Sequence, residues 1–150
     1  SGKAEKDDYL KSLGAGSVIS RADLSEENKR PMAAETWAHG IDTVGGEILS
    51  NVIKGLKYGG SVAICGLVAS PAFSTTVLPF ILRNVNVLGV DSVELPLAKK
   101  QEIWHRLATD LKPDALDKMT TEVALDGLSD VIDSIIQGGV SGRTLVKLDD

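Results

Sequence analysis

Hydrophobic residues in this chain recur at two different spacings. Over residues 47–57 and 97–111 they return every three or four positions, which predicts helices with one apolar face. Shorter apolar runs lie over 40–44, 61–65 and 85–90, and such runs between turn residues are typical of buried strands. The middle of the chain is therefore expected to fold as strands separated by helices.

The flanking segments continue this alternation. They comprise helices over 3–13 and 128–137, strands over 17–19 and 143–148, short apolar segments over 76–82 and 120–125, a turn over 58–60, and a loop with one helical turn over 22–36. Strands that alternate with helices indicate an α/β fold, here a doubly wound parallel sheet flanked by helices. The part after Pro113 either adds to this sheet or belongs to another domain.

Composition and charge narrow the class of protein. The chain has 150 residues, 43% hydrophobic and 25% charged, and a domain of this size can bury a real core. Its formal net charge of -5 argues against a nucleic-acid surface, which needs a basic stripe. No apolar run approaches the roughly 18 residues of a transmembrane helix, so we expect no membrane partner and a cytoplasmic location.

Residue types that carry chemistry are few. The one cysteine, Cys65, offers neither a disulfide framework nor a Cys-rich zinc site, and its apolar run predicts a buried, inert thiol. His39 and His105 stand alone, so no spaced ligand set predicts a metal. Arg143 precedes an expected strand and is either a cation directed at a phosphate or a solvated turn residue.

The sequence has no complete glycine-rich loop of the kind that cradles dinucleotide phosphates. Residues 14–19 begin like that motif but lack its third glycine, and they follow a helix where the motif requires a strand. We interpret Gly14 as the end of the first helix. A chain that has the fold of a dinucleotide-binding domain but not this loop either has another function or is a fragment of such a domain.

Ser1, Gly2 and Lys3, at the start of the first helix, and Arg21, after the expected strand 17–19, could contact a dinucleotide. A hydroxyl and basic groups at such positions can accept the 2′-phosphate of NADP. The alternative is that all four are solvated surface residues.

Small residues lie at the carboxyl ends of three of the expected strands. They occupy the segments 42–46, 65–67 and 89–92. Ligands of open α/β sheets bind in a crevice outside the carboxyl ends of the strands, and glycine lets the backbone approach a ligand closely. Together the three segments favour a ligand crevice.

Several of these segments also resemble a known family. The stretches 9–15, 40–45, 58–67, 78–85 and 88–93 are similar to the acryloyl-CoA reductase type of NADPH quinone oxidoreductase, in the medium-chain dehydrogenase/reductase superfamily. Residues 142–147 resemble that family's C-terminus. The likeness runs in order over nearly the whole chain.

The resemblance implies a two-domain, zinc-independent enzyme of which this chain is a C-terminal fragment. Residues 1–112 would be a partial NADPH-binding Rossmann domain without its first βαβ unit, and residues 113–150 would pack toward the missing catalytic domain. Carried over by position, the implied cofactor contacts are Ser1, Gly2, Lys3 and Arg21 on the 2′-phosphate and adenosine side, Gly66 and Leu67 beside the nicotinamide ribose, Val90, Asp91 and Ser92 near the nicotinamide, and Arg143.

The implied chemistry is hydride transfer from NADPH to an activated carbon–carbon double bond in an unsaturated acyl-CoA or a quinone. The family pairs into homodimers through the strand matching 85–90, and an open apolar edge favours such pairing on physical grounds. The fragment itself is expected to be inactive. A non-enzymatic α/β module for assembly or ligand sensing stays open, as does a methyltransferase-like domain, which the opening helix disfavours.

Overall fold

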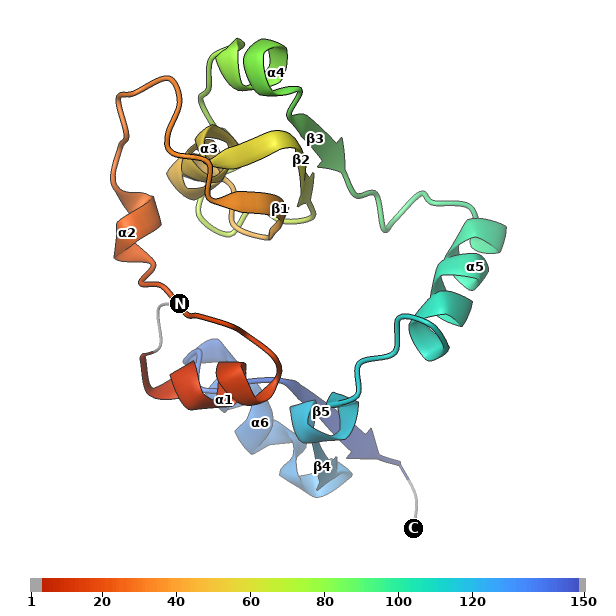
Figure 1. The fold of residues 1–150 in the computed structure, drawn as a ribbon. Coiled ribbons are helices and arrows are strands. Elements are labelled where there is room, and N and C mark those ends of the chain that lie inside the picture. Colours follow the sequence, from red (N-terminus) through yellow and green to blue (C-terminus); the bar gives the residue numbers. More distant parts are fainter. Residues whose placement is uncertain (1–3, 149–150) are drawn as a thin grey trace. The chain divides into compact units, whose positions relative to one another are not determined.

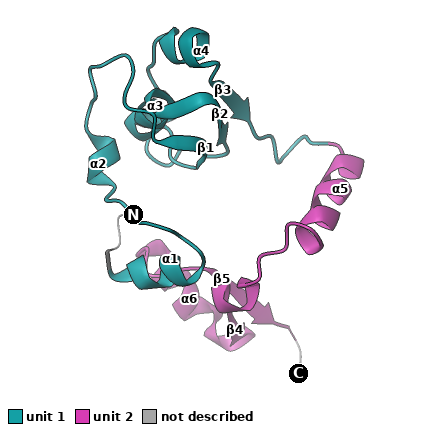
Figure 2. Ribbon diagram, viewed as in Figure 1, with its two compact units in different colours: residues 1–95 teal, residues 96–150 magenta. Residues whose placement is uncertain are grey.

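The computed structural model describes residues 4–148, and the chain divides into two compact units (Figure 2). The first unit contains residues 1–95 and the second residues 96–150. The predicted division at 112/113, with residues 113–150 packing toward a catalytic domain, stays a prediction.

The first unit is built around a three-stranded parallel sheet in the order β1-β2-β3 (Figure 1). Its elements are η1 (Ala4–Lys6), α1 (Asp7–Ser12), α2 (Ala22–Ser25), β1 (Trp37–Asp42), α3 (Gly46–Lys54), β2 (Leu56–Ile64), α4 (Leu78–Arg83) and β3 (Asn86–Gly89). Parallel neighbours require crossover connections, and α3 and α4 lie in the two crossovers. This confirms the predicted α/β class.

The hydrophobic core of this unit lies between α3 and the sheet. Leu49 and Ile53 from α3 pack with Leu56 and Val62 from β2 and with Val85, and all five side chains are buried. The helical spacing of the first pair, and a bulge in β2 between Leu56 and Val62, turn these residues to a common side. Burial of such side chains supplies the main stabilisation of the unit.

The other side of the sheet carries exposed apolar side chains. Ile41 of β1 is 81% exposed and Leu88 of β3 is 51% exposed. Both alternate with residues that face the core, as the period of a strand requires. Helices of the first unit therefore cover one face of its sheet. The apolar runs in the sequence had predicted helices on both faces.

The second unit contains a separate parallel pair of strands. Its elements are α5 (Leu97–Ala108), η2 (Leu116–Met119), β4 (Thr120–Ala124), η3 (Leu125–Gly127), α6 (Leu128–Ile136) and β5 (Arg143–Lys147), with β4 paired to β5. The predicted strand 143–148 and the two predicted helices are confirmed. Residues 120–124 pair with β5 in a two-stranded sheet of their own.

Two predicted local features are wrong. Residues 17–19 form no strand, and the side chain of Ile19 instead lines an apolar pocket beside β1. The predicted turn at 58–60 lies inside β2, where the register jumps from Trp37↔Leu56 to His39↔Ser61. The extra residues form a bulge in β2, and Gly59 takes a φ of +72° there. Within residues 4–148, none of the helices combines the length and the apolar character of a transmembrane span.

Arg83, at the end of α4, ties the amino-terminal side of the sheet together. Its guanidinium donates to the carbonyl oxygens of Lys54 (3.0 Å), Leu56 (3.3 Å) and Ala33 (2.8 Å), and Nε lies 3.5 Å from a carboxylate oxygen of Glu35. The Arg83 side chain is 15% exposed. One cation thus donates to three carbonyls: one at the end of α3, one at the start of β2 and one in the loop before β1.

We expect Arg83→Ala to lower the free energy of unfolding of the first unit by about 3 kcal/mol, because three carbonyls lose a charged donor in a mostly buried place. Urea unfolding followed by circular dichroism measures this. Arg30→Ala, at an exposed position of the same unit, is the matched control and should stay within about 0.5 kcal/mol. Equal stability of the two variants would contradict the anchoring role.

Candidate functional site

The carboxyl ends of the three parallel strands meet at one edge of the sheet. The register pairs Asp42 with Ile64 and Ile64 with Gly89, so the next residues of each strand leave the sheet side by side. The segments that follow β1, β2 and β3 are therefore neighbours. These are the segments in which the sequence predicted small residues around a ligand crevice.

The loop after β1 and the loop after β2 are joined through their backbones. The N–H of Cys65 donates to the carbonyl of Asp42 at 2.9 Å, and the N–H of Ala69 donates to the carbonyl of Val44 at 2.8 Å. A parallel bridge links Gly45 with Ser70. Residues 43–46 and 65–70 thus form one continuous rim, which we call the paired rim.

Two glycines allow the loops to come this close. A Cβ at Gly66 would collide with the backbone of Thr43, and a Cβ at Gly45 would collide with the carbonyl of Ser70. Gly45 also takes a φ of +71°, a conformation that favours glycine. In the paired rim, Gly45 and Gly66 are therefore needed for contact between the two loops.

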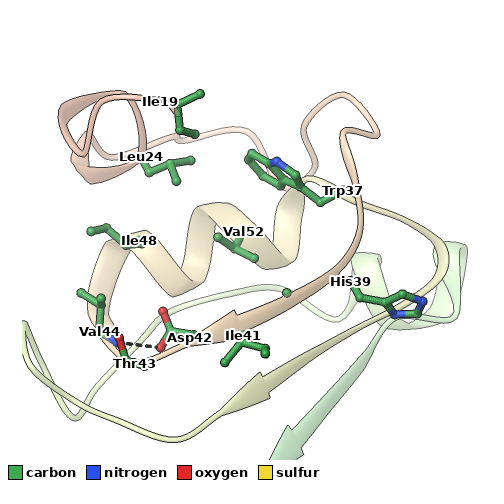
Figure 3. Close-up of a pocket in the computed structure, with 11 residues that line it drawn as sticks. Ile19, Leu24, Trp37, His39, Ile41, Asp42, Thr43, Val44, Ile48 and Val52 are labelled. Atoms are coloured by element: carbon green, nitrogen blue, oxygen red, sulfur yellow. Dashed lines mark hydrogen bonds between the residues drawn. The ribbon is translucent and has the colours of Figure 1, made fainter. Parts of the chain in front are cut away.

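A buried carboxylate holds the first loop of the paired rim. Asp42 is 5% exposed, and its Oδ2 accepts hydrogen bonds from the N–H groups of Val44 (3.1 Å) and Gly45 (2.7 Å). Figure 3 shows the other carboxylate oxygen pointing away from this loop, into a pocket of about 270 Å³ between β1, α3 and the segment around Leu24. The rest of that lining is mainly apolar, with Ile48 and Val52 contributed by α3.

The loop after β3 is shaped by its own aspartate. The N–H of Val90 donates to the carbonyl of Ile64 at 3.0 Å, which continues the ladder one residue past β3. The Asp91 carboxylate accepts from the N–H groups of Val93 (2.9 Å) and Glu94 (3.0 Å). This carboxylate is therefore turned onto its own loop, while Val90 is 52% exposed at the sheet edge.

The structure brings some of the predicted site residues together. Gly66 and Leu67 follow β2, and Val90, Asp91 and Ser92 follow the neighbouring strand β3. Leu67 is 64% exposed.

The other predicted positions do not belong to these post-strand loops. Ser1, Gly2 and Lys3 fall outside the described residues. Arg21 is exposed at the start of α2, and Arg143 is the first residue of β5 in the second unit. The cofactor contacts that the resemblance implies for these residues stay predictions.

Two features of the site differ from, or go beyond, the sequence prediction. Cys65 was expected to be buried and is exposed, because β2 ends at Ile64 and the thiol belongs to the loop that follows. Its Sγ lies 3.4 Å from the carbonyl oxygen of Asp42. Asp42 was not predicted as a site residue. The available signal was a carboxylate at the end of an apolar strand, directly before a loop with two glycines.

Metal ligands do not gather in the described part of the chain. Among residues 4–148, no group of three or more His, Cys, Asp or Glu side chains could hold a metal ion. His39 instead pairs with Ser61, with 3.0 Å between Nδ1 and Oγ. What the site offers is backbone, small side chains and exposed apolar groups around a sheet edge.

Known proteins resemble this chain in sequence and in fold. An acrylyl-CoA reductase of Ruegeria pomeroyi is 42% identical over 147 residues, which cover 98% of this chain and 44% of that protein. The crystal structure of the yhdH oxidoreductase of Salmonella enterica in complex with NADP is 46% identical, with a TM-score of 0.89 over 99% of this chain and 45% of its own. Bacillus subtilis protein yhfP, solved with NAD bound, is 40% identical with a TM-score of 0.91 over 98% of this chain and 45% of its own.

The chain thus spans less than half the length of these relatives. Residues 1–111 match the family described as zinc-binding dehydrogenases. The predicted superfamily is confirmed, and this chain belongs to the zinc-binding dehydrogenase family of medium-chain dehydrogenases/reductases.

Proposed function

We propose that this chain forms part of the nucleotide-binding region of an NADPH-dependent oxidoreductase that reduces an activated carbon–carbon double bond. The observation that carries the proposal is the meeting of three post-strand loops at one edge of a parallel sheet, where open α/β sheets bind their ligands. The relatives support the cofactor, since the S. enterica protein was crystallised with NADP and an Escherichia coli relative with NADPH. The R. pomeroyi reductase supports an unsaturated acyl-CoA as substrate, with a quinone as the alternative.

The residues of the sheet edge have separate tasks in this proposal. The backbone of Gly66 approaches the nicotinamide ribose, and the exposed Leu67 side chain covers the ribose. Val90 and Ser92 border the nicotinamide. Asp91 shapes the loop that carries them, because its carboxylate is already bonded to backbone N–H groups.

Positive charge for the 2′-phosphate comes from Lys3 and Arg21, with Ser1 and Gly2 beside them. Arginine and lysine form strong, charge-assisted hydrogen bonds with phosphate. Arg143 remains a predicted cofactor contact in the second unit.

When bound, NADPH supplies the hydride, and this chain holds and orients the cofactor. We assign no acid or base among residues 4–148. We propose that the enzyme is zinc-independent, as the family resemblance implies. We propose that the 150 residues alone do not turn over, and that the enzyme acts in the cytoplasm.

The enzyme is proposed to be a homodimer that pairs through β3. This strand is at the end of the order β1-β2-β3, so one side of its backbone has no strand partner in the described unit. An unpaired edge offers free N–H and C=O groups to a second copy. The N–H of Val90 points to β2, so the N–H of Gly89, one residue earlier, points to the open side.

In the full-length natural protein that contains these residues, we expect acrylyl-CoA to oxidise NADPH. We expect NADPH to bind more tightly than NADH. Lys3→Ala should weaken NADPH binding about tenfold and leave NADH binding unchanged, because one charged phosphate contact is lost. Calorimetric titration measures both constants, and Lys11→Ala, exposed on α1, is the control. Absence of turnover with acyl-CoA and quinone substrates alike would contradict the proposed function.

Bound NADPH should protect Cys65 from alkylation by iodoacetamide. The thiol is exposed and immediately precedes Gly66, so labelling of this cysteine reports on the loop after β2. We expect the rate to fall about fivefold at saturating NADPH, since bound ligand suppresses local opening and covers the thiol. Mass spectrometry over time gives the rate. A rate that does not respond to NADPH binding would place the cofactor elsewhere.

Gly89→Pro should convert the dimer into a monomer, because proline removes the N–H that faces the open side of β3. Gly89→Ala is the matched control: it keeps that N–H, and its Cβ meets nothing within 4 Å. Light scattering after gel filtration distinguishes the two states. A Gly89→Pro protein that stays dimeric would show that pairing occurs at another surface.

A further inference from the structure

Asp42 is the most deeply buried acidic side chain near the proposed cofactor loops. At 5% exposure its charge is largely removed from water, and a buried carboxylate costs free energy unless it is hydrogen-bonded. One oxygen accepts from two consecutive backbone N–H groups, at 2.7 and 3.1 Å. Hydrogen bonds to a charged acceptor are about twice as strong as neutral ones, so the carboxylate fixes the backbone of residues 44 and 45 firmly.

The loop that Asp42 fixes cannot move independently of the loop after β2. The carbonyls of Asp42 and Val44 accept hydrogen bonds from the second loop, and the backbone of Thr43 lies where a Cβ of Gly66 would be. Contacts this close transmit displacement, because no free volume is left to absorb it. A shift of residues 44 and 45 would therefore shift Gly66 and Leu67.

We propose that Asp42 is a positioning residue for the cofactor, which acts through the paired rim. Its carboxylate sets the 43–46 loop, and that loop sets where Gly66 and Leu67 stand beside the nicotinamide ribose. Asp42 itself touches no cofactor in this arrangement, since its second oxygen faces the apolar pocket on the α3 side (Figure 3). The inference rests on the proposed function for its ligand, but the mechanical coupling between the two loops does not.

The coupling is tested first without any ligand, on the 150-residue chain. Because Cys65 is bonded to the carbonyl of Asp42, its alkylation rate reports how well the paired rim is held. We expect Asp42→Ala to raise that rate about fivefold, since both hydrogen bonds that close the first loop are lost. Asp42→Asn keeps one oxygen for the same two N–H groups and should restore a rate within about twofold of the original.

The effect of Asp42 on NADPH binding is tested in the full-length natural protein that contains these residues. The dissociation constant for NADPH is expected to rise about tenfold in Asp42→Ala and about threefold in Asp42→Asn, because the loop must be reordered when the ligand binds. Arg83→Ala is the control: it should destabilise the unit from the amino-terminal side of the sheet while leaving the NADPH constant of the folded protein unchanged.

Each outcome separates the two proposals. If the unsubstituted protein binds no NADPH, the proposed function fails, and the ligand-free alkylation rates still decide the coupling. If NADPH binds equally well to the unsubstituted protein and to Asp42→Ala, Asp42 does not position the cofactor. If Arg83→Ala raises the alkylation rate and the NADPH constant as much as Asp42→Ala does, the effect is general loss of stability, and the inference is overturned.

Discussion

The close approach of Thr43 and Gly66 is the constraint on which the rest of the site depends. Parallel strands bring their carboxyl ends to one edge, but side chains would normally keep the following loops apart. Here the missing Cβ of Gly66, and that of Gly45 against Ser70, lets two backbones meet directly. The two loops become one paired rim, and the adjoining end of β3 completes an edge that is lined by backbone and small groups.

The elements that a local pattern could predict were found. α3 repeats Leu49, Ile53 and their neighbours at helical spacing, and β2 carries Val62 within an apolar run, so both were expected close to their observed positions. Their burial follows directly from that spacing. β1 begins at Trp37, earlier than expected. The ring of Trp37 lies against Gly55, which is a contact between residues distant in sequence. The helix α4 was missed as a helix, although Pro79 sits in its first turn, where proline is well tolerated.

What could not be predicted depends on neighbours distant in sequence. Residues 17–19 have the composition of a strand, but a strand exists only with a partner, and Ile19 is used for packing instead. Cys65 has apolar residues before it, yet the strand stops one residue short of it. The burial of Asp42 was not predicted either, since an aspartate at the start of a glycine-containing loop is typical of an exposed turn. In each case a contact with a residue distant in sequence decides the structure, and the local sequence does not contain that contact.

The two oxygens of Asp42 connect two different surfaces of the first unit. One oxygen holds the paired rim at the carboxyl end of the sheet, and the other faces the pocket beside β1. On the side away from β2, β1 has no strand partner in the described unit. A strand edge and an apolar pocket are surfaces that a longer chain or a second chain can cover, and burial there would lower the local dielectric around the carboxylate. Lower dielectric strengthens the hydrogen bonds to residues 44 and 45. Any chain that covers the edge of β1 would therefore also strengthen the hydrogen bonds that hold the paired rim.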